Sequence, residues 1–266
     1  MAHTDSQTLT LRRILLVIAT GVGAGFLSGL FGVGGGLVIV PALMALLGMD
    51  QRRASATSLA AIIVTAAVGS GTYALHGEVS WAGGALLVVG ALVGSQIGVW
   101  LLRRLPAPVL PWILIGFTLF VIVSQYLQVP TREGVVSLTS ASCALLILVG
   151  VCAGILSGLV GVGGGSVIVP GMELAVGAGD LIARGTSLLV MIPTGIAGTV
   201  TNLRHRMVDL RVGLIVGASA AATAPAGRLV ATLVSPSVGA ILFNIFLVSI
   251  IASTILKMRK KARAQG

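Results

Sequence analysis

Long apolar stretches, separated by short polar ones, fill most of the chain. A helix rises about 1.5 Å per residue, so a stretch of about 20 apolar residues crosses the roughly 30 Å of hydrocarbon in a bilayer. The long stretches, each predicted to be a transmembrane helix, are 14–31, 56–75, 82–102, 109–128, 136–160, 183–203, 211–233 and 237–256. Two shorter stretches, 37–48 and 166–177, are typical of half-helices or re-entrant segments.

One glycine-rich motif occurs twice. Residues 25–41 read GFLSGLFGVGGGLVIVP, and residues 154–170 read GILSGLVGVGGGSVIVP, an offset of 129 with 14 of 17 positions identical. The same offset aligns Thr57 and Ser58 with Thr186 and Ser187. The chain is therefore predicted to be an all-α polytopic membrane protein with a first repeat (1–130) and a second repeat (131–266). Each repeat would have four long transmembrane helices and one short broken or re-entrant helix.

Composition supports a membrane protein and weakens one tempting alternative. Hydrophobic residues make up 56% of the chain and charged residues 9%, too few to cover the surface of a water-soluble domain. The net charge of +10 is the kind of excess that nucleic-acid-binding proteins carry, but the basic residues stand in short clusters between apolar stretches. That pattern follows the positive-inside rule, so the expected partner is the lipid bilayer, and no nucleic acid is expected.

The basic clusters also predict how the repeats are oriented. Arg52–Arg53 and Arg103–Arg104 flank the first repeat's stretches, and the loop 76–80 has no Lys or Arg. In the second repeat, Arg204, Arg206 and Arg211 stand at the equivalent of that loop. Equivalent loops therefore prefer opposite sides of the membrane. We expect inverted repeats related by a twofold axis in the membrane plane, with both termini cytoplasmic.

The glycine triplets are the first candidate for a substrate site: Gly34, Gly35, Gly36, Gly163, Gly164 and Gly165. Glycine adopts backbone conformations that other residues rarely reach, and unwound backbone at membrane depth occurs where it is buried in protein or lines a cavity. Its N–H groups and the N-terminus of the following short helix suit an anion. A tight hairpin between packed helices is the alternative.

Hydroxyl groups are the second candidate. Thr57, Ser58, Thr186 and Ser187 open the next long stretch and could supply further donors to an anion. A polar stripe could line a pathway, or its hydroxyls could bond back to their own helices: Ser28, Thr65, Thr72, Ser157, Thr194 and Thr201. Glu173, which replaces Met44 of the first repeat, is the carboxylate expected at depth. The sequence suggests no catalytic constellation, metal cluster or cofactor motif.

The doubled motif, G-x-x-S-G-x-x-G-V-G-G-G-x-x-x-V-P followed by a Thr-Ser pair, resembles the sulfite exporter TauE/SafE family of membrane proteins. The resemblance covers nearly the whole chain after about residue 12. It implies a multi-pass transporter in the bacterial inner membrane that exports sulfite, a related sulfur oxyanion or an organosulfonate.

A secondary transporter working by alternating access is therefore the expected function, and an enzyme is not. Duplicated halves with broken helices around a central site are common in such transporters. An anion channel and a non-catalytic membrane scaffold subunit are the alternatives. The sequence does not decide whether transport is coupled to an ion, either a proton or sodium, or whether the protein forms a homo-oligomer.

Overall fold

The computed structural model describes residues 11–106, 109–126, 134 and 139–263. Within these ranges the structure is helical and has no strand, which confirms the predicted all-α class. Ends of two predicted stretches, 127–128 and 136–138, lie outside the described residues. The helices are α1 (Leu11–Phe31), α2 (Gly36–Leu46), α3 (Gln51–Ala74), α4 (Trp81–Arg104), α5 (Val109–Tyr126), α6 (Ser140–Val160), α7 (Gly165–Val176), α8 (Asp180–Arg204), α9 (Leu210–Leu233) and α10 (Pro236–Arg263).

Seven of the eight predicted transmembrane helices are long and apolar enough to cross a bilayer: α1, α3, α4, α6, α8, α9 and α10. The eighth, α5, has 18 residues in the described part, and its apolar stretch covers Val109–Phe120. The two short stretches form α2 and α7, of 11 and 12 residues.

Polar side chains at the helix starts explain why several helices begin earlier than hydropathy predicts. Asp50 Oδ1 accepts a hydrogen bond from Arg53 N at 3.1 Å, so α3 starts within a charged segment. Ser80 and Asp209, which are equivalent in the two repeats, cap α4 and α9 in the same way, at 3.2 Å each. Arg52 and Arg53 therefore belong to the first turn of α3.

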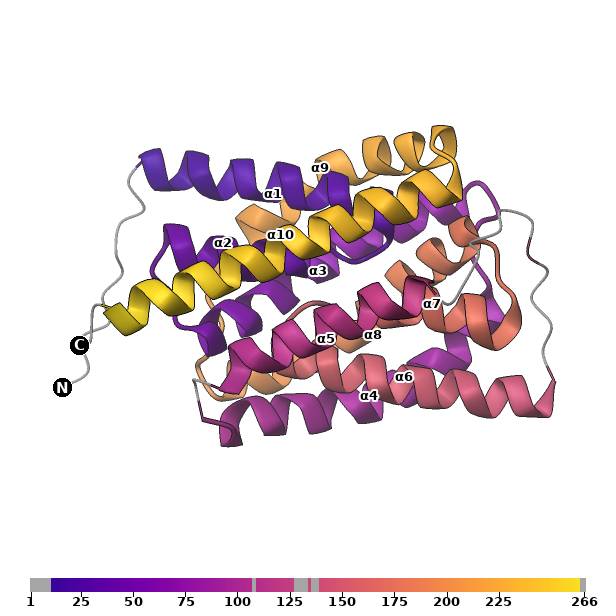
Figure 1. Cartoon of the computed structure of the whole chain (residues 1–266), viewed down its shortest axis with the longest axis horizontal. Coiled ribbons are helices and arrows are strands. Elements are labelled where there is room, and N and C mark those ends of the chain that lie inside the picture. The colour runs from indigo at the N-terminus through magenta and orange to yellow at the C-terminus, as the bar shows by residue number, and fades with distance from the viewer. Residues whose placement is uncertain (1–10, 107–108, 127–133, 135–138, 264–266) are drawn as a thin grey trace.

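Two pairs of parallel helices flank the molecule, α1 beside α9 and α4 beside α6, as Figure 1 shows. Each contact depends on glycine. A Cβ at Gly90, Gly94 or Gly98 would collide with the backbone of α6, and the glycines of α1 meet the backbone of α9 in the same way. Removing the side chain lets helix backbones approach closely, which is how membrane helices gain packing energy without a hydrophobic driving force.

The equivalent helices α3 and α8 pack against each other at the centre and run antiparallel. Gly69, late in α3, lies beside Leu188, early in α8, whereas Leu59, early in α3, lies beside Gly198. These two are the most deeply buried of the seven long apolar helices.

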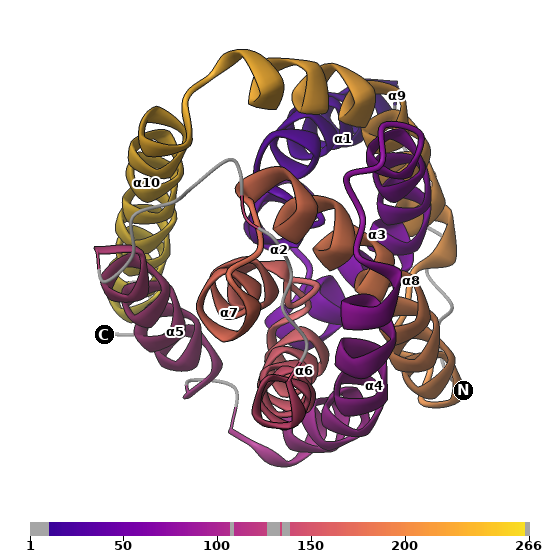
Figure 2. The ribbon, with the colours of Figure 1, turned by 90° about the vertical axis from the view of Figure 1, so that its right-hand side faces the viewer.

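The short helices lie inside the molecule, surrounded by longer ones (Figure 2). After α1 the chain reverses, so that Gly35 lies beside Ala24 in the middle of α1. From there α2 packs into one apolar cluster with Val17 of α1, through Ile39 and Leu43. The second repeat reverses in the same way, with Gly164 beside Ala153 of α6. We call residues 32–36 and 161–165 the first and second glycine breaks.

The start of α1 and the end of α10 lie at the same end of the molecule (Figure 1). The arginine clusters gather there as well, since α3 and α9 begin at this end and α4 and α8 finish at it. These arginines are Arg52, Arg53, Arg103, Arg104, Arg204, Arg206 and Arg211.

Candidate functional site

The two glycine breaks adopt the same left-handed backbone. Gly34 and Gly35 have φ of 74° and 75°, and Gly163 and Gly164 have φ of 91° and 77°. A side chain in this region is strained, which explains the first two glycines of each triplet. Gly35 and Gly164 serve as the N-caps of α2 and α7.

The breaks also touch each other, although they are 129 positions apart. A Cβ at Gly36 would lie 2.5 Å from the carbonyl oxygen of Gly161, and one at Gly165 would collide with the carbonyl oxygen of Gly32. Met191 lies close to Gly34 and Gly163 alike. The structure thus brings all six predicted triplet glycines to one place at the centre of the molecule.

The two predicted serines hold the breaks from the opposite repeat. Ser187 Oγ donates to Gly32 O at 2.8 Å, and Ser58 Oγ donates to Gly161 O. Both side chains are fully buried. In this structure each hydroxyl proton points to a backbone carbonyl, so the serines fix the shape of the breaks and could accept, rather than donate, a further hydrogen bond.

The threonines directly before these serines make a second pair of contacts between the repeats. Thr57 Oγ1 accepts a hydrogen bond from Asp209 N at 3.0 Å, and Thr186 Oγ1 accepts one from Ser80 N at 2.9 Å. Asp209 and Ser80 are the N-caps of α9 and α4. The threonines therefore join each central helix to the loop before the next helix of the other repeat.

The predicted pathway residues divide into two groups. Four threonines bond back to carbonyls of their own helices, which is the alternative that the sequence left open: Thr65, Thr72, Thr194 and Thr201. Ser28 and Ser157 are equivalent, at most 2% exposed, and have no hydrogen-bond partner for Oγ among the described residues.

A cavity of about 40 Å³ opens beside the second break. A water needs about 10–15 Å³ of such space, so the cavity suits a small ion rather than a large molecule. The end of α1, the first break, α7, α8 and α10 supply its walls. Its polar lining consists of Gly165, Ser166, Glu173 and Arg184, and its apolar lining of Phe31, Val33, Val169, Pro170, Pro236, Gly239, Ala240 and Phe243.

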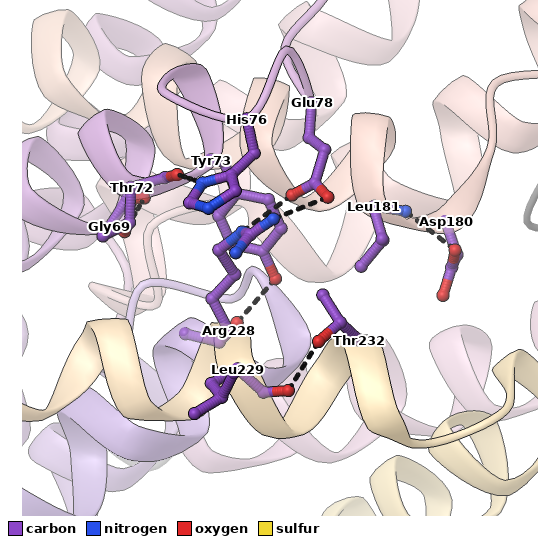
Figure 3. A network of polar contacts seen from close by, with 11 residues as sticks. Gly69, Thr72, Tyr73, His76, Glu78, Asp180, Leu181, Arg228, Leu229 and Thr232 are labelled. Carbon is purple, nitrogen blue, oxygen red and sulfur yellow. Dashed lines mark hydrogen bonds and ion pairs between the residues drawn. The ribbon is translucent and has the colours of Figure 1, made fainter.

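The two buried arginines in this region are each paired with a carboxylate. Arg184 forms an ion pair with Asp180 at 3.3 Å and donates to Leu30 O at 2.8 Å. Arg228 binds Glu78 through two hydrogen bonds, of 2.8 and 2.7 Å, and its guanidinium lies over the ring of Tyr73 (Figure 3). Two rigid, charge-assisted bonds make this pair a strong link between α9 and the loop after α3.

Sequence reasoning expected Glu173 to be the one carboxylate at depth, and it did not place Asp180 and Arg184 there. Asp180 is 1% exposed and Arg184 7%, although Asp180 precedes the predicted stretch 183–203 and Arg184 is only its second residue. One signal could have found them, because the offset of 129 places Gln51 and Ser55 at their equivalent positions. A charge without a counterpart in the other repeat indicates a specialised role.

Comparisons with known proteins agree with this architecture. The family model described as sulfite exporter TauE/SafE matches residues 2–124 and 146–266. A probable membrane transporter protein of Xylella fastidiosa is 27% identical over 86% of this chain and 89% of its own length. One from Haemophilus influenzae is 30% identical over 70% of this chain and 72% of its own. The probable membrane transporter protein YunE of Bacillus subtilis is 32% identical over 45% of this chain, and the chain spans about half of that relative (46%). No solved structure matches the chain.

Proposed function

Because the chain belongs to the sulfite exporter TauE/SafE family, we propose that it is a secondary transporter that exports a small anion. Sulfite, a related sulfur oxyanion or an organosulfonate is the proposed substrate class. The relatives are bacterial and are named as probable membrane transporters, so the protein is a multi-pass membrane protein of a transporter family. The inner membrane is its proposed location.

The contact between the two glycine breaks is the observation that carries the proposal. Each contact has a twin with the roles of the repeats exchanged: Ser58 with Gly161 and Ser187 with Gly32, Thr57 with Asp209 and Thr186 with Ser80. Contacts of this kind are expected from a twofold axis. Together with the antiparallel α3 and α8, they support inverted repeats with the axis in the membrane plane.

An anion at the breaks would meet backbone donors from both repeats. The first intrahelical bonds of α2 are donated by Val38 and Ile39 to Gly35 O, so the N–H groups of Gly36 and Leu37 precede them. The second repeat is the same, with Val167 and Ile168 bonding Gly164 O. Helix N-termini attract anions through these free donors and the helix dipole.

Alternating access follows if the paired bundles rock about this central contact. In the proposed orientation the arginine-rich end faces the cytoplasm, with both termini on that side. The glycine breaks would then form the part of the site that both states share, because they lie between the halves that move.

The test is counterflow in liposomes that contain the purified protein. The liposomes are loaded with excess unlabelled sulfite, and radiolabelled sulfite is added outside. The labelled sulfite should then accumulate inside for a time, above its electrochemical equilibrium. A channel would pass sulfite without counterflow, and a scaffold subunit would pass none. Either result would contradict the proposal.

A further inference from the structure

The cavity beside the second glycine break has a polar wall that neither the predicted site nor the family match assigns. Ser166 and Glu173 lie seven positions apart on α7, so they share a helix face, and both line the cavity. Ser166 is 1% exposed, and its Oγ has no hydrogen-bond partner among the described residues. A buried hydroxyl left without a partner costs free energy, which a bound ligand would recover.

Two sources of positive potential converge on the same space. The guanidinium of Arg184 lines the cavity from α8, and α7, a helix of 12 residues, begins at Gly165 in its wall. A guanidinium presents several donors in a fixed plane, which matches the oxygens of a sulfonate or sulfite group. The helix N-terminus adds backbone donors and a partial positive charge.

Glu173 is the feature that an ordinary anion site would lack. An ionised carboxylate on the wall would repel the anion at close range in a medium of low dielectric constant. A neutral carboxyl group would instead donate one more hydrogen bond to it. The charged groups that face Glu173 are Arg184 and Asp180, both on α8. The cavity-lining residues of α10 carry no titratable group, α6 carries only the thiols of Cys143 and Cys152, and α5 within its described side chains none.

We propose that this cavity binds a sulfur oxyanion through Ser166, Arg184 and the N-terminus of α7, and that Glu173 takes up one proton when the anion binds. The inference rests on the proposed function and deepens it, since it names a second subsite and the coupling ion. The proton comes from water, joins one carboxylate oxygen of Glu173 and returns to water when the anion leaves. Anion and proton then cross together, and no bond in the anion changes.

The equivalent positions of the first repeat carry different side chains, which indicates that the polar lining is specific to the second repeat. Its equivalents of Ser166, Glu173 and Arg184 are Leu37, Met44 and Ser55. Leu37 is 2% exposed and packs in the apolar core, and Ser55 donates to Val160 O at 2.8 Å. The backbone around the break therefore does not require a charged lining.

Calorimetry of the purified full chain with methanesulfonate tests the proposal. This anion does not titrate near neutral pH, so proton uptake measured in buffers of different ionisation enthalpy belongs to the protein. We expect about one proton taken up per anion bound. Glu173→Gln should bind without proton uptake, and Ser166→Ala should weaken binding roughly fivefold to tenfold. Met44→Gln, the same substitution at the equivalent position, should change neither quantity.

Arg184 needs a variant that leaves no buried charge behind. Asp180→Asn/Arg184→Gln removes both members of the ion pair and should weaken methanesulfonate binding roughly tenfold to a hundredfold. Wild-type binding without proton uptake would overturn the coupling. Binding unchanged by Ser166→Ala and by the double variant would overturn the subsite, while counterflow of sulfite would leave the proposed function standing. If the wild-type protein binds no sulfur oxyanion and shows no counterflow, both the proposed subsite and the proposed function are contradicted.

Discussion

The surroundings of the two glycine breaks differ, although the breaks themselves have the same sequence, GVGGG. Three equivalent pairs of positions set them apart: Leu37 and Ser166, Met44 and Glu173, Ser55 and Arg184. The helix after the first break carries Leu37 and Met44, whereas the helix after the second carries Ser166 and Glu173, which line the cavity together with Arg184. The two breaks share one backbone shape, and these few side chains give their surroundings different chemistry.

A second difference lies near the charged cavity. The ion pair of Glu78 and Arg228 has Met207 and Val99 at the equivalent positions of the other repeat. Both charged differences occur towards the end of the molecule opposite the arginine clusters, where α3 finishes and α8 begins. If the repeats are inverted, this end faces away from the cytoplasm, and the two ends of the molecule differ in their buried charges.

The largest expected effect tests what the two breaks share. Gly35→Val and Gly164→Val should each abolish transport, because valine resists a φ near 75° and its Cβ would press on the backbone oxygen of Ala24 or Ala153. Membrane insertion should stay near that of the wild type. The measurement is sulfite counterflow together with the amount of protein in the membrane.

Gly71→Val is the matched control, since a Cβ at Gly71 meets open space. Equal losses in the two break variants would support a site shared by both repeats. Normal transport by either one would show that only the other break is needed.

The next effect tests the ion pair that only one side has. Glu78→Gln leaves the guanidinium of Arg228 without its ionised partner. The side chain of Arg228 is only 10% exposed, so water does not replace that partner. Removing one member of a buried pair costs about 3–5 kcal/mol, so the free energy of unfolding in detergent should fall by that order. Glu78→Gln/Arg228→Met should recover most of the loss. A single variant as stable as the wild type would mean that the pair is fully hydrated.

A smaller effect tests the reciprocal serines. Ser58→Ala and Ser187→Ala each leave a buried carbonyl without its donor, which costs about 1–3 kcal/mol of unfolding free energy. Because the contacts are equivalent, we expect the two losses to be similar, with substrate binding weakened to a comparable extent. Ser249→Ala, at an exposed serine of α10, should be near neutral. A loss in only one of the two serine variants would show that the breaks are not equally held.

Local patterns in the sequence explain why most of the architecture could be predicted. Apolar stretches and the doubled motif are visible in single windows, so ten elements, two breaks and their glycines follow from them. Helix starts were missed where polar residues precede the apolar stretch: Asp50 caps α3, and Asp180 is the first residue of α8. Hydropathy counts such turns as loop, and this placed Asp180 outside the helix that it begins.

The cavity could not be predicted for a different reason. Its walls come from the end of α1, the first break, α7, α8 and α10, which the chain brings together only in the folded state. The partners of Thr57 and Thr186 lie in the loops of the opposite repeat, 152 and 106 positions away. The sequence shows that a threonine could bind an anion. It does not show that the hydroxyl already bonds to a residue far away in the chain.

The last prediction concerns topology rather than stability. It tests whether the two repeats are inverted in the membrane, on which the comparison of the two glycine breaks depends. His76 and His205 are equivalent, exposed and located just after the ends of the antiparallel α3 and α8. If the repeats are inverted in the membrane, these two positions face opposite sides. Single cysteines at position 76 or 205, in a chain whose Cys143 and Cys152 are replaced by serine, should react with an impermeant maleimide from opposite sides of oriented vesicles. Position 205 should be the cytoplasmic one, because it neighbours Arg204 and Arg206 and contacts Arg103. Labelling of both positions from one side would leave the repeats parallel to each other in the membrane, and the two break surroundings would then open to the same compartment.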